Sequence, residues 1–500
     1  MNHFSVICEN EAATITLAET MALALRHGDL VTLKGDLAAG KTTLARAIIR
    51  SAAADQFTEV PSPTFTLVQS YEELPFGSLT HMDLYRIEDG SEIEELGLDE
   101  ALTKGVVVIE WPQKANGFLP EPSIAITIEQ NAVESRIFTF QGAQEALNRI
   151  ERSLAIRSFL NANGHENSTR AHLTGDASSR AYETIIPKKG ENIILMNAPP
   201  MADGAPIQDG KPYSQIAKLA ENMRPFVALA QTLAQQDFRA PHIYAQDLTQ
   251  GFLLLENLGT DSIVTDANQP IEQRYLVAVE TLAEIHQKKW QSECPMVDGI
   301  THHIPAFDRE AILIEVALLS DWYAPYKLDR QLHVDEKEAF TTIWNGLIDQ
   351  LESTEKSLVL RDYHSPNVIW LDGAKGSSRI GIIDFQDALI GPTAYDVASL
   401  AQDARVDVSV DLETKLVDHY CLIRENFEEQ QFRQAYAIMA AERATKVLGI
   451  FVRLSKRDGK HGYLSHLPRI EEYLRRSLSH PMLADYRNWV ENVLHKQTAK

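Results

Sequence analysis

The chain has 500 residues, of which 44% are hydrophobic and 23% charged, so it is long enough for at least two domains and is neither collagen-like, disordered nor a small disulfide scaffold. Its 47 Lys and Arg against 70 Asp and Glu give a net charge of −23, which disfavours non-specific binding to nucleic acids and anionic membranes. Three isolated cysteines, no basic and apolar leader, and no apolar run of about 18 residues predict a cytoplasmic protein without a zinc or redox motif.

The first 145 residues predict a compact α/β unit. An apolar strand over residues 30–33 is followed by a glycine-bearing loop and by a helix over residues 42–53. Further strand patterns follow at residues 65–70, 79–85, 106–110, 124–128 and 136–140.

A polar stretch with turn-forming residues at 163–168 follows a predicted helix over residues 145–163. Beyond it, β-rich segments at 180–186 and 192–197 lead into mainly helical patterns, which a hairpin-like segment interrupts at 358–384. We therefore predict two domains, residues 1–148 and residues 149–500.

Residues 35–42 fit the pattern GxxxxGK followed by Ser or Thr, between a predicted strand and a predicted helix. Gly35 and Gly40 let backbone N–H groups at the helix N-terminus face phosphate oxygens. Lys41 is expected to reach the β- and γ-phosphates, and the Thr42 hydroxyl to bind Mg²⁺. The motif thus predicts ATP and Mg²⁺ as cofactors. The predicted nucleotide-binding residues are Gly35, Asp36, Leu37, Ala38, Ala39, Gly40, Lys41, Thr42 and Thr43.

Such a site also needs a carboxylate at a strand end to hold the metal or its waters. Asp83 and Glu110 both end apolar runs and are the candidates. We predict that Asp83 orients the attacking water as a catalytic residue and that Glu110 binds the metal. The reverse assignment stays open.

Several segments of this first domain, in this order, resemble the TsaE family of ATPases, which serves the synthesis of N6-threonylcarbamoyladenosine in bacterial tRNA. The resemblance covers about the first 145 residues and implies an α/β P-loop NTPase domain. The matching segments are residues 35–43, 62–65, 81–86, 94–100 and 108–112.

The TsaE resemblance implies further roles. It makes Thr64 part of a nucleotide-sensing switch, places Trp111 close to the nucleotide, and names TsaB and TsaD as protein partners through which tRNA is reached. The chain departs from the family at Ala38, where glycine is common. The acidic run over residues 88–100 is either a solvated face or a surface for these partners.

A second set of residues points to phosphoryl transfer. Asp362 is followed five residues later by Asn367, and Asp384 ends an apolar run. Transfer to a hydroxyl needs a carboxylate that accepts its proton, here Asp362, and oxygen ligands for Mg²⁺, here Asn367 and Asp384. We interpret His364 as a hydrogen-bonded loop residue and Asp396 as a structural anchor of this loop or of a helix start.

These residues resemble the aminoglycoside phosphotransferase and choline kinase-like superfamily, which implies an α+β protein-kinase-like fold over roughly residues 150–490. Segments 175–180, 196–200 and 224–226 are more similar to the amino-sugar kinases called AmgK. That resemblance implies phosphorylation of the anomeric hydroxyl of N-acetylmuramate and N-acetylglucosamine.

The same resemblance implies that Ser178, Arg180 and Glu256 bind nucleotide, the last in a hinge segment over residues 254–259. The superfamily's usual strand lysine is missing from residues 193–197, a gap that the amino-sugar kinases share. Arg180, Lys188 and Lys189 are nearby cations that could take the place of this lysine, and the choice among the three stays open.

The main hypothesis is a bifunctional protein: an ATPase subunit for tRNA threonylcarbamoylation, followed by an ATP-dependent amino-sugar kinase. One alternative makes the second half a nucleotide-sensing module without turnover. Another keeps the kinase but changes its acceptor to an aminoglycoside, a choline-like amine or homoserine. No membrane association and no strong direct binding of nucleic acid are expected.

Overall fold

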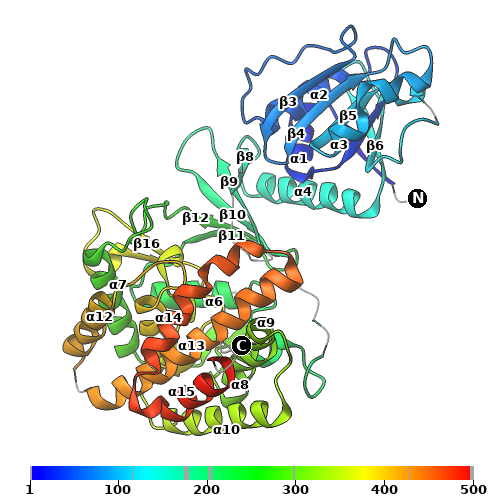
Figure 1. Ribbon diagram of the computed structural model, residues 1–500. Helices are drawn as coiled ribbons and strands as arrows, with labels where there is room; N and C mark the ends of the chain where they lie inside the picture. Colours follow the sequence, from blue (N-terminus) through cyan, green and yellow to red (C-terminus); the bar gives the residue numbers. More distant parts are fainter. Residues whose placement is uncertain are drawn as a thin grey trace. The chain divides into compact units, whose positions relative to one another are not determined.

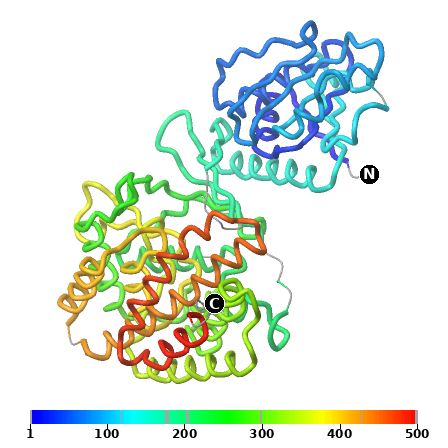
Figure 2. The backbone as a smooth tube through the Cα atoms, in the orientation of Figure 1, coloured from blue at the N-terminus to red at the C-terminus, as the bar shows by residue number. Residues whose placement is uncertain are grey.

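The computed structural model describes residues 3–115, 117–173, 180–200, 204, 206–296, 299–425 and 427–495. The chain divides into two compact units, Met1–Leu195 and Met196–Lys500. Figures 1 and 2 show the path of the backbone through each unit, coloured from blue at the N-terminus to red at the C-terminus. Within the described residues, no helix has both the length and the apolar character that crossing a membrane requires.

A mixed sheet lies at the centre of the first unit. Its seven strands among the described residues have the order β1-β7-β6-β2-β5-β4-β3. β2 lies between β5 and β6 and is parallel to both, and β4 is parallel to β5. The strands are β1 (His3–Cys8), β2 (Leu30–Lys34), β3 (Val68–Leu74), β4 (Gly77–Asp83), β5 (Gly105–Glu110), β6 (Ile124–Gln130) and β7 (Arg136–Gly142). The helices around them are α1 (Glu11–Ala24), α2 (Lys41–Ala52), α3 (Leu98–Leu102) and α4 (Gln144–Ala162).

Alternating strand residues build a core on each face of this sheet. Val31 and Leu33 pack in one cluster together with residues of α1, α2 and α4. Leu30 points to the other face and packs with Met82 and Ile109. Because successive strand residues point to opposite faces, the apolar run of β2 is buried on both sides, as is typical of a central parallel strand.

Most predicted elements of this unit are confirmed to within a few residues. The strand predicted over residues 65–70 is wrong at its start, since β3 begins at Val68. Leu67 has a φ of 63° and its N–H donates to the carbonyl of Pro63 at 2.6 Å, which closes a turn before the strand. The domain boundary predicted after residue 148 falls within α4 and stays a prediction.

Helix α4 leads into a second group of strands. β8 (Thr169–Leu173) and β9 (Ala181–Ile186) are antiparallel, with Arg170 opposite Ile185, and β10 (Ile193–Asn197) is the next neighbour of β9. The division between the two units falls inside β10. The β-rich segments predicted at 180–186 and 192–197 are therefore confirmed, whereas β8 was not predicted.

Helices make up most of the second unit, as the sequence predicts. The hairpin-like segment predicted at 358–384 forms parts of two antiparallel pairs, β15 with β18 and β16 with β17. The strands that lie wholly in this unit are β11 (Ile243–Asp247), β12 (Phe252–Glu256), β13 (Glu293–Pro295), β14 (Thr301–His303), β15 (Lys356–Val359), β16 (Val368–Trp370), β17 (Ile380–Ile382) and β18 (Leu389–Pro392). The α-helices are α5 (Tyr213–Ile216), α6 (Arg224–Gln235), α7 (Glu272–Gln287), α8 (Arg309–Leu318), α9 (Ala324–Leu328), α10 (Val334–Leu351), α11 (Ala394–Ala401), α12 (Val410–Ile423), α13 (Glu429–Asp458), α14 (Leu467–Ser477) and α15 (Ala484–Val490).

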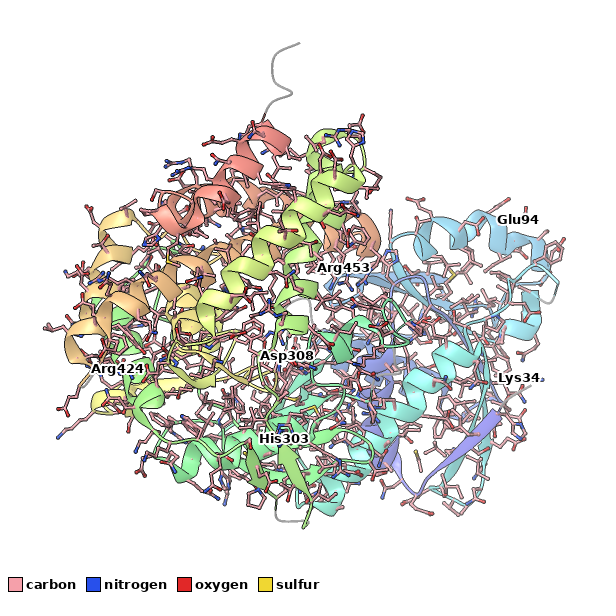
Figure 3. All side chains as sticks on the ribbon, turned by 90° about the horizontal axis from the view of Figure 1, so that it is seen from below. Lys34, Glu94, His303, Asp308, Arg424 and Arg453 are labelled. Carbon is pink, nitrogen blue, oxygen red and sulfur yellow. The ribbon has the colours of Figure 1, made fainter. Side chains whose placement is uncertain are left out.

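The long helix α13 packs against α8, α11 and α14. It approaches the end of α8 at Gly449, where a Cβ atom would lie 2.3 Å from the backbone carbonyl of Leu318. The other end of α8 is capped by Asp308, which is labelled in Figure 3. Asp308 Oδ1 accepts a hydrogen bond from Ala311 N at 2.9 Å. Glycine at position 449 thus sets the distance between the two helices.

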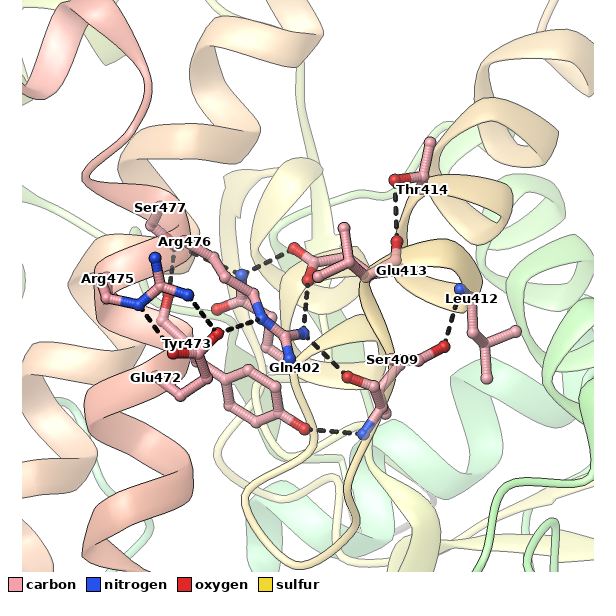
Figure 4. A network of polar contacts seen from close by, with 12 residues as sticks. Gln402, Ser409, Leu412, Glu413, Thr414, Glu472, Tyr473, Arg475, Arg476 and Ser477 are labelled. Atoms are coloured by element: carbon pink, nitrogen blue, oxygen red, sulfur yellow. Dashed lines mark hydrogen bonds and ion pairs between the residues drawn. The ribbon is translucent and has the colours of Figure 1, made fainter.

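Polar contacts fasten α14 to the segment that precedes α12 (Figure 4). The Arg476 guanidinium donates to the carbonyl of Val408 at 2.8 Å and lies 3.4 Å from the Glu413 carboxylate. Val408 N donates to the Tyr473 hydroxyl at 2.9 Å, and Gln402 Nε2 donates to Glu413 at 2.7 Å. The loop after α11 is held in place by these bonds.

We predict that Gly449→Ala lowers the free energy of unfolding of the second unit by about 1–3 kcal/mol, because the added methyl group forces α13 and α8 apart. Chemical denaturation measures the change. The matched control is Gly346→Ala in α10, where a Cβ would meet no atom within 4 Å and where alanine should stabilise the helix by up to about 1 kcal/mol. Equal stabilities of the two variants would contradict this account of the helix packing.

Candidate functional sites

The phosphate-binding motif joins β2 to α2, directly after Lys34 (Figure 3). A Cβ at Gly35 would lie 2.8 Å from the carbonyl of Ile128, and Gly40 has a φ of 107°, so both positions require glycine. Ala38 takes a φ of 64°, a left-handed conformation that costs a residue with a side chain about 1–3 kcal/mol. Ala38 therefore adds backbone strain, but the loop still adopts the left-handed conformation at this position.

Lys41 lies folded into the motif. Its Nζ donates to the carbonyls of Gly35 at 2.9 Å and Asp36 at 2.8 Å, and it lies 3.6 Å from the centre of the Trp111 ring. Burial lowers the pKa of Lys41, and the nearby Glu110 carboxylate counteracts only part of that effect. The structure thus brings Trp111 and Lys41 together, as expected for residues that share one nucleotide site.

The two carboxylates end neighbouring parallel strands, with Asp83 opposite Glu110. Glu110 Oε2 accepts a hydrogen bond from the Thr42 hydroxyl at 2.9 Å, and Asp83 Oδ2 accepts one from the Thr64 hydroxyl at 2.5 Å. Glu110 therefore meets the residue predicted to bind Mg²⁺, and Asp83 meets the residue predicted to act as a switch.

His81 is a functional candidate that the sequence analysis missed. It is fully buried, and its Nε2 lies 2.9 Å from Glu110 Oε1. His81 stands two residues before Asp83 on β4, a spacing that puts both side chains on one face of the strand. That period-two spacing is the signal by which it could have been found. Its contact fixes the orientation of the Glu110 carboxylate.

These oxygen donors fit a magnesium ion. Mg²⁺ prefers carboxylate, hydroxyl and amide oxygens, and in nucleotide sites it takes its remaining ligands from phosphates and water. Thr42 with Glu110 in the first unit, and Asn367 with Asp384 in the second, supply such donors. Among the described residues, no group of three or more His, Cys, Asp and Glu side chains lies together as a metal site.

In the second unit, Asp362 and Asn367 belong to one short loop that ends in the 3₁₀ turn η4 (Ser365–Asn367). Asn367 Nδ2 donates to the backbone carbonyl of Asp362 at 2.9 Å, so the Asn367 side chain is tied to the backbone of Asp362. Asp384 follows β17 with a φ of 59°, and its Oδ1 accepts a hydrogen bond from Gln386 Nε2 at 3.0 Å. Residues with a strained backbone conformation of this kind cluster at functional sites.

Two buried carboxylates, those of Asp396 and Asp403, accept hydrogen bonds from the backbone of this loop. Asp396, on α11, accepts hydrogen bonds from the backbone N–H groups of Leu360 at 2.6 Å and Arg361 at 2.9 Å. Asp403 accepts one from Ser365 N at 2.7 Å. The anchoring role predicted for Asp396 is confirmed, whereas Asp403 was missed because nothing in the sequence connects it with the loop.

A buried charge cluster lies beside Asp362. Arg361, with a φ of 73°, forms an ion pair with Glu315 of α8, and Lys446 of α13 donates to the same carboxylate at 2.7 Å. Burial raises the pKa of the Asp362 carboxyl, but Lys446 and the other nearby basic groups outweigh burial and hold that pKa below its ordinary value. Burial together with the Glu315 carboxylate raises the pKa of Glu442 far above its usual range. Sequence reasoning missed this cluster, whose members come from distant helices.

His364 lies in the same loop and is buried. Its Nε2 is 3.4 Å from the Arg405 guanidinium, as suits a hydrogen-bonded loop residue. Burial lowers the pKa of His364 to about 4 against the pull of the Asp403 carboxylate, so the imidazole is neutral at pH 7.

The predicted nucleotide contacts of the second half are placed unevenly. The Glu256 carboxylate pairs with Arg239 at 2.8 Å. The backbone N–H of Glu256 donates to the carbonyl of His242 at 2.8 Å, and Glu256 is the last residue of β12. Arg180 directly precedes β9, and Lys188 and Lys189 are exposed. Ser178 lies outside the described residues. These contacts stay predictions.

Two family models match the chain. The family described as "Threonylcarbamoyl adenosine biosynthesis protein TsaE" matches residues 8–138, and the one described as "Phosphotransferase enzyme family" matches residues 170–436. The matches confirm the two predicted resemblances and with them the predicted fold classes, a P-loop NTPase domain followed by a protein-kinase-like domain.

Individual relatives agree with these matches. The N-acetylmuramate/N-acetylglucosamine kinase of Caulobacter vibrioides is 32% identical over 365 residues, which cover 70% of this chain and 99% of the relative. The kinase of the same name from Pseudomonas putida is 31% identical over 320 residues, 62% of this chain and 84% of the relative. The tRNA threonylcarbamoyladenosine biosynthesis protein TsaE of Rickettsia felis is 40% identical over 124 residues, 25% of this chain and 71% of the relative.

His364 generates a pH prediction. Its imidazole titrates near 6.5 in an unfolded chain and at about 4 in the folded one, so the unfolded state binds more protons between these values and stability falls as the pH drops below 6.5. Between pH 7.5 and pH 5 this group alone should cost about 2 kcal/mol. In His364→Gln the loss should be smaller by that amount in urea denaturation, and an unchanged pH dependence would contradict the prediction.

Proposed function

Because the chain belongs to the TsaE family through residues 8–138 and to the phosphotransferase enzyme family through residues 170–436, we propose that it is a bifunctional ATP-using enzyme. We assign residues 1–148 to an ATPase domain that serves tRNA threonylcarbamoyladenosine synthesis. Residues 149–500 form an amino-sugar kinase that phosphorylates the anomeric hydroxyl of N-acetylmuramate and N-acetylglucosamine. The placement of Asp362 and Asn367 on one anchored loop, together with the match along nearly the whole length of a kinase of that name, carries the second assignment.

In the ATPase domain, each residue has a task that its contacts support. The N–H groups of residues 35–43 cradle the phosphates, and Lys41 exchanges its two carbonyl partners for phosphate oxygens when ATP binds. Thr42 and Glu110 would hold Mg²⁺, which would supply positive charge against the phosphates. Asp83 orients the attacking water, and Thr64, bonded to Asp83, couples that position to the preceding turn.

The ATPase domain works with partner proteins. We assign TsaB and TsaD as those partners, through which an acidic chain reaches tRNA. In support of a docking surface, Glu94 (labelled in Figure 3) and Glu95 are exposed on the 3₁₀ helix η1 (Gly90–Leu96). Ile93, directly before them, is buried. Glu100, by contrast, is already paired with Lys104 at 2.7 Å.

In the kinase domain, the sugar hydroxyl attacks the γ-phosphorus of ATP as the bond to the ADP oxygen breaks, and Asp362 accepts the hydroxyl proton. The nearby cations keep Asp362 ionised for this task. Asn367 and Asp384 would hold Mg²⁺, which would supply positive charge against the transferred phosphate. Ser178 and Arg180 bind the phosphates, and Glu256 belongs to the hinge that meets adenine.

We predict that the wild-type protein transfers labelled γ-phosphate from ATP to N-acetylmuramate and N-acetylglucosamine, and that Asp362→Asn lowers this rate about 10²–10⁴-fold because the hydroxyl proton loses its acceptor. Lys41→Ala should abolish nucleotide binding at the first site and leave transfer to sugar unchanged. Thin-layer or mass analysis of the products measures the transfer of phosphate to sugar in both variants. Asp266→Asn, at an exposed loop position of the same unit, is the matched control.

Other outcomes would decide against the proposal. Phosphate on an aminoglycoside, a choline-like amine or homoserine instead of the sugars would replace the acceptor. No transfer to any of these, with ADP still bound in the second half, would identify a nucleotide-sensing module. Loss of sugar phosphorylation in Lys41→Ala would contradict the independence of the two sites.

A further inference from the structure

One buried guanidinium in the second unit has no partner. Arg443 lies in the middle of α13 (Figure 1) and is 6% exposed. Among the described residues, no carboxylate, carbonyl or hydroxyl group accepts a hydrogen bond from its guanidinium or forms an ion pair with it. A charged side chain held out of water without a partner costs free energy. An arginine in this state points to a ligand that supplies the missing anion.

The charged end of Arg443 is the part of the side chain that a ligand can reach. Nε of Arg424 is enclosed by the protein without a partner, whereas none of the three guanidinium nitrogens of Arg443 is enclosed in this way. The small exposed fraction of Arg443 therefore includes its nitrogen atoms. Arg361, by contrast, is 1% exposed and is paired with Glu315.

Contacts of α13 place this helix face beside the loop that carries Asp362. Lys446 follows Arg443 by three residues on the same helix, so the two side chains are neighbours on one face. Lys446 Nζ lies 2.7 Å from Glu315 Oε1. Glu315 also pairs with Arg361, the residue directly before Asp362. All these residues belong to the second unit, so the site is built within it.

The Asp362 carboxylate lies within reach of the charge on Arg443. Burial raises the pKa of the Asp362 carboxyl, and four basic side chains lower it. They are Lys446, His364, Arg361 and Arg443. Lys446 and Arg361 share the Glu315 carboxylate, and His364 Nε2 lies 3.4 Å from the Arg405 guanidinium. Of these four, Arg443 alone has no hydrogen bond or ion pair with any described residue, so its charge is available to a substrate.

The two proposed acceptors differ in one charged group. N-acetylmuramate carries a carboxylate on its lactyl ether, where N-acetylglucosamine has a hydroxyl group. A chain of net charge −23 repels a carboxylate, so binding of the charged sugar requires a local cation. A guanidinium suits this task because its N–H groups bind a carboxylate through two parallel hydrogen bonds.

We propose that Arg443 is a specificity-determining residue of the acceptor site, where its guanidinium binds the carboxylate of N-acetylmuramate while the anomeric hydroxyl meets Asp362. This inference rests on the proposed function of the kinase half. Arg443 distinguishes the charged acceptor from the neutral one and takes no part in the transfer of the proton. N-acetylglucosamine binds without this ion pair.

The test compares the two sugars as acceptors of full-length Arg443→Gln, which keeps a polar side chain but removes the charge. The KM for N-acetylmuramate should rise about 10–100-fold, because a charge-assisted hydrogen bond is lost. The KM for N-acetylglucosamine and the kcat for both sugars should stay nearly unchanged. Arg443→Lys, which keeps the charge, should restore part of the affinity for N-acetylmuramate. The matched control is Arg457→Gln, which removes an exposed guanidinium near the end of α13 that pairs with Asp458.

Three outcomes of these kinetics would overturn the inference. An equal loss with both sugars would assign Arg443 to the transferred phosphate, the other anion at the site. Unchanged kinetics with N-acetylmuramate would leave the guanidinium without a role in binding. In both of these cases sugar is still phosphorylated, so the proposed function stands. If the wild type phosphorylates neither sugar, the proposed function fails and the inference fails with it.

Two further measurements distinguish substrate binding from a structural role of Arg443. Because its guanidinium has no partner within the described protein, Arg443→Gln should unfold at the same urea concentration as the wild type or at a higher one. A lower midpoint would assign a structural role and overturn the inference. Calorimetric titration of N-acetylmuramate in the presence of ADP and Mg²⁺, where no transfer occurs, should show weaker binding to Arg443→Gln. An unchanged affinity in this titration would contradict the proposed ion pair.

Discussion

Two backbone hydrogen bonds to the buried carboxylate of Asp396 are the interaction on which the second site depends. They hold the backbone of Leu360 and Arg361, the two residues directly before Asp362, the proposed proton acceptor. Arg361 adopts a left-handed backbone conformation, which a residue with a side chain keeps only where its surroundings hold it in place. A site whose groups are oriented before the substrate arrives spends little free energy on reorganisation during the reaction.

A carboxylate performs the corresponding task in the first unit. Glu110 lies between His81 and Thr42, so the imidazole orients the carboxylate and the carboxylate orients the hydroxyl. Both proposed sites also face the same electrostatic repulsion, because a chain of net charge −23 repels the negative charges of ATP. In each unit the cations near the site are buried and held by hydrogen bonds, Lys41 in one and Lys446 in the other, which makes the attraction local.

The contiguous parts of both sites could be predicted from the sequence. The loop from Gly35 to Thr42 and the spacing of Asp362 and Asn367 are local patterns that one segment of chain carries by itself. Glu315 and Asp403 could not be predicted, because helices distant in sequence bring them to the loop only through tertiary packing. The early start predicted for β3 has a related cause. Phe65 and Leu67 are apolar and favour a strand by composition, but Leu67 N bonds to the carbonyl of Pro63 and closes a turn. β8 was overlooked because its five residues alternate weakly and the charged Arg170 lies buried in it.

The central claim is that one chain carries two separate nucleotide sites, and the stoichiometry of ADP binding to the full-length protein tests it most directly. Calorimetric titration in the presence of Mg²⁺ should give two ADP per wild-type chain and one per Lys41→Ala chain. A single ADP per wild-type chain, or the loss of all binding in Lys41→Ala, would contradict the account.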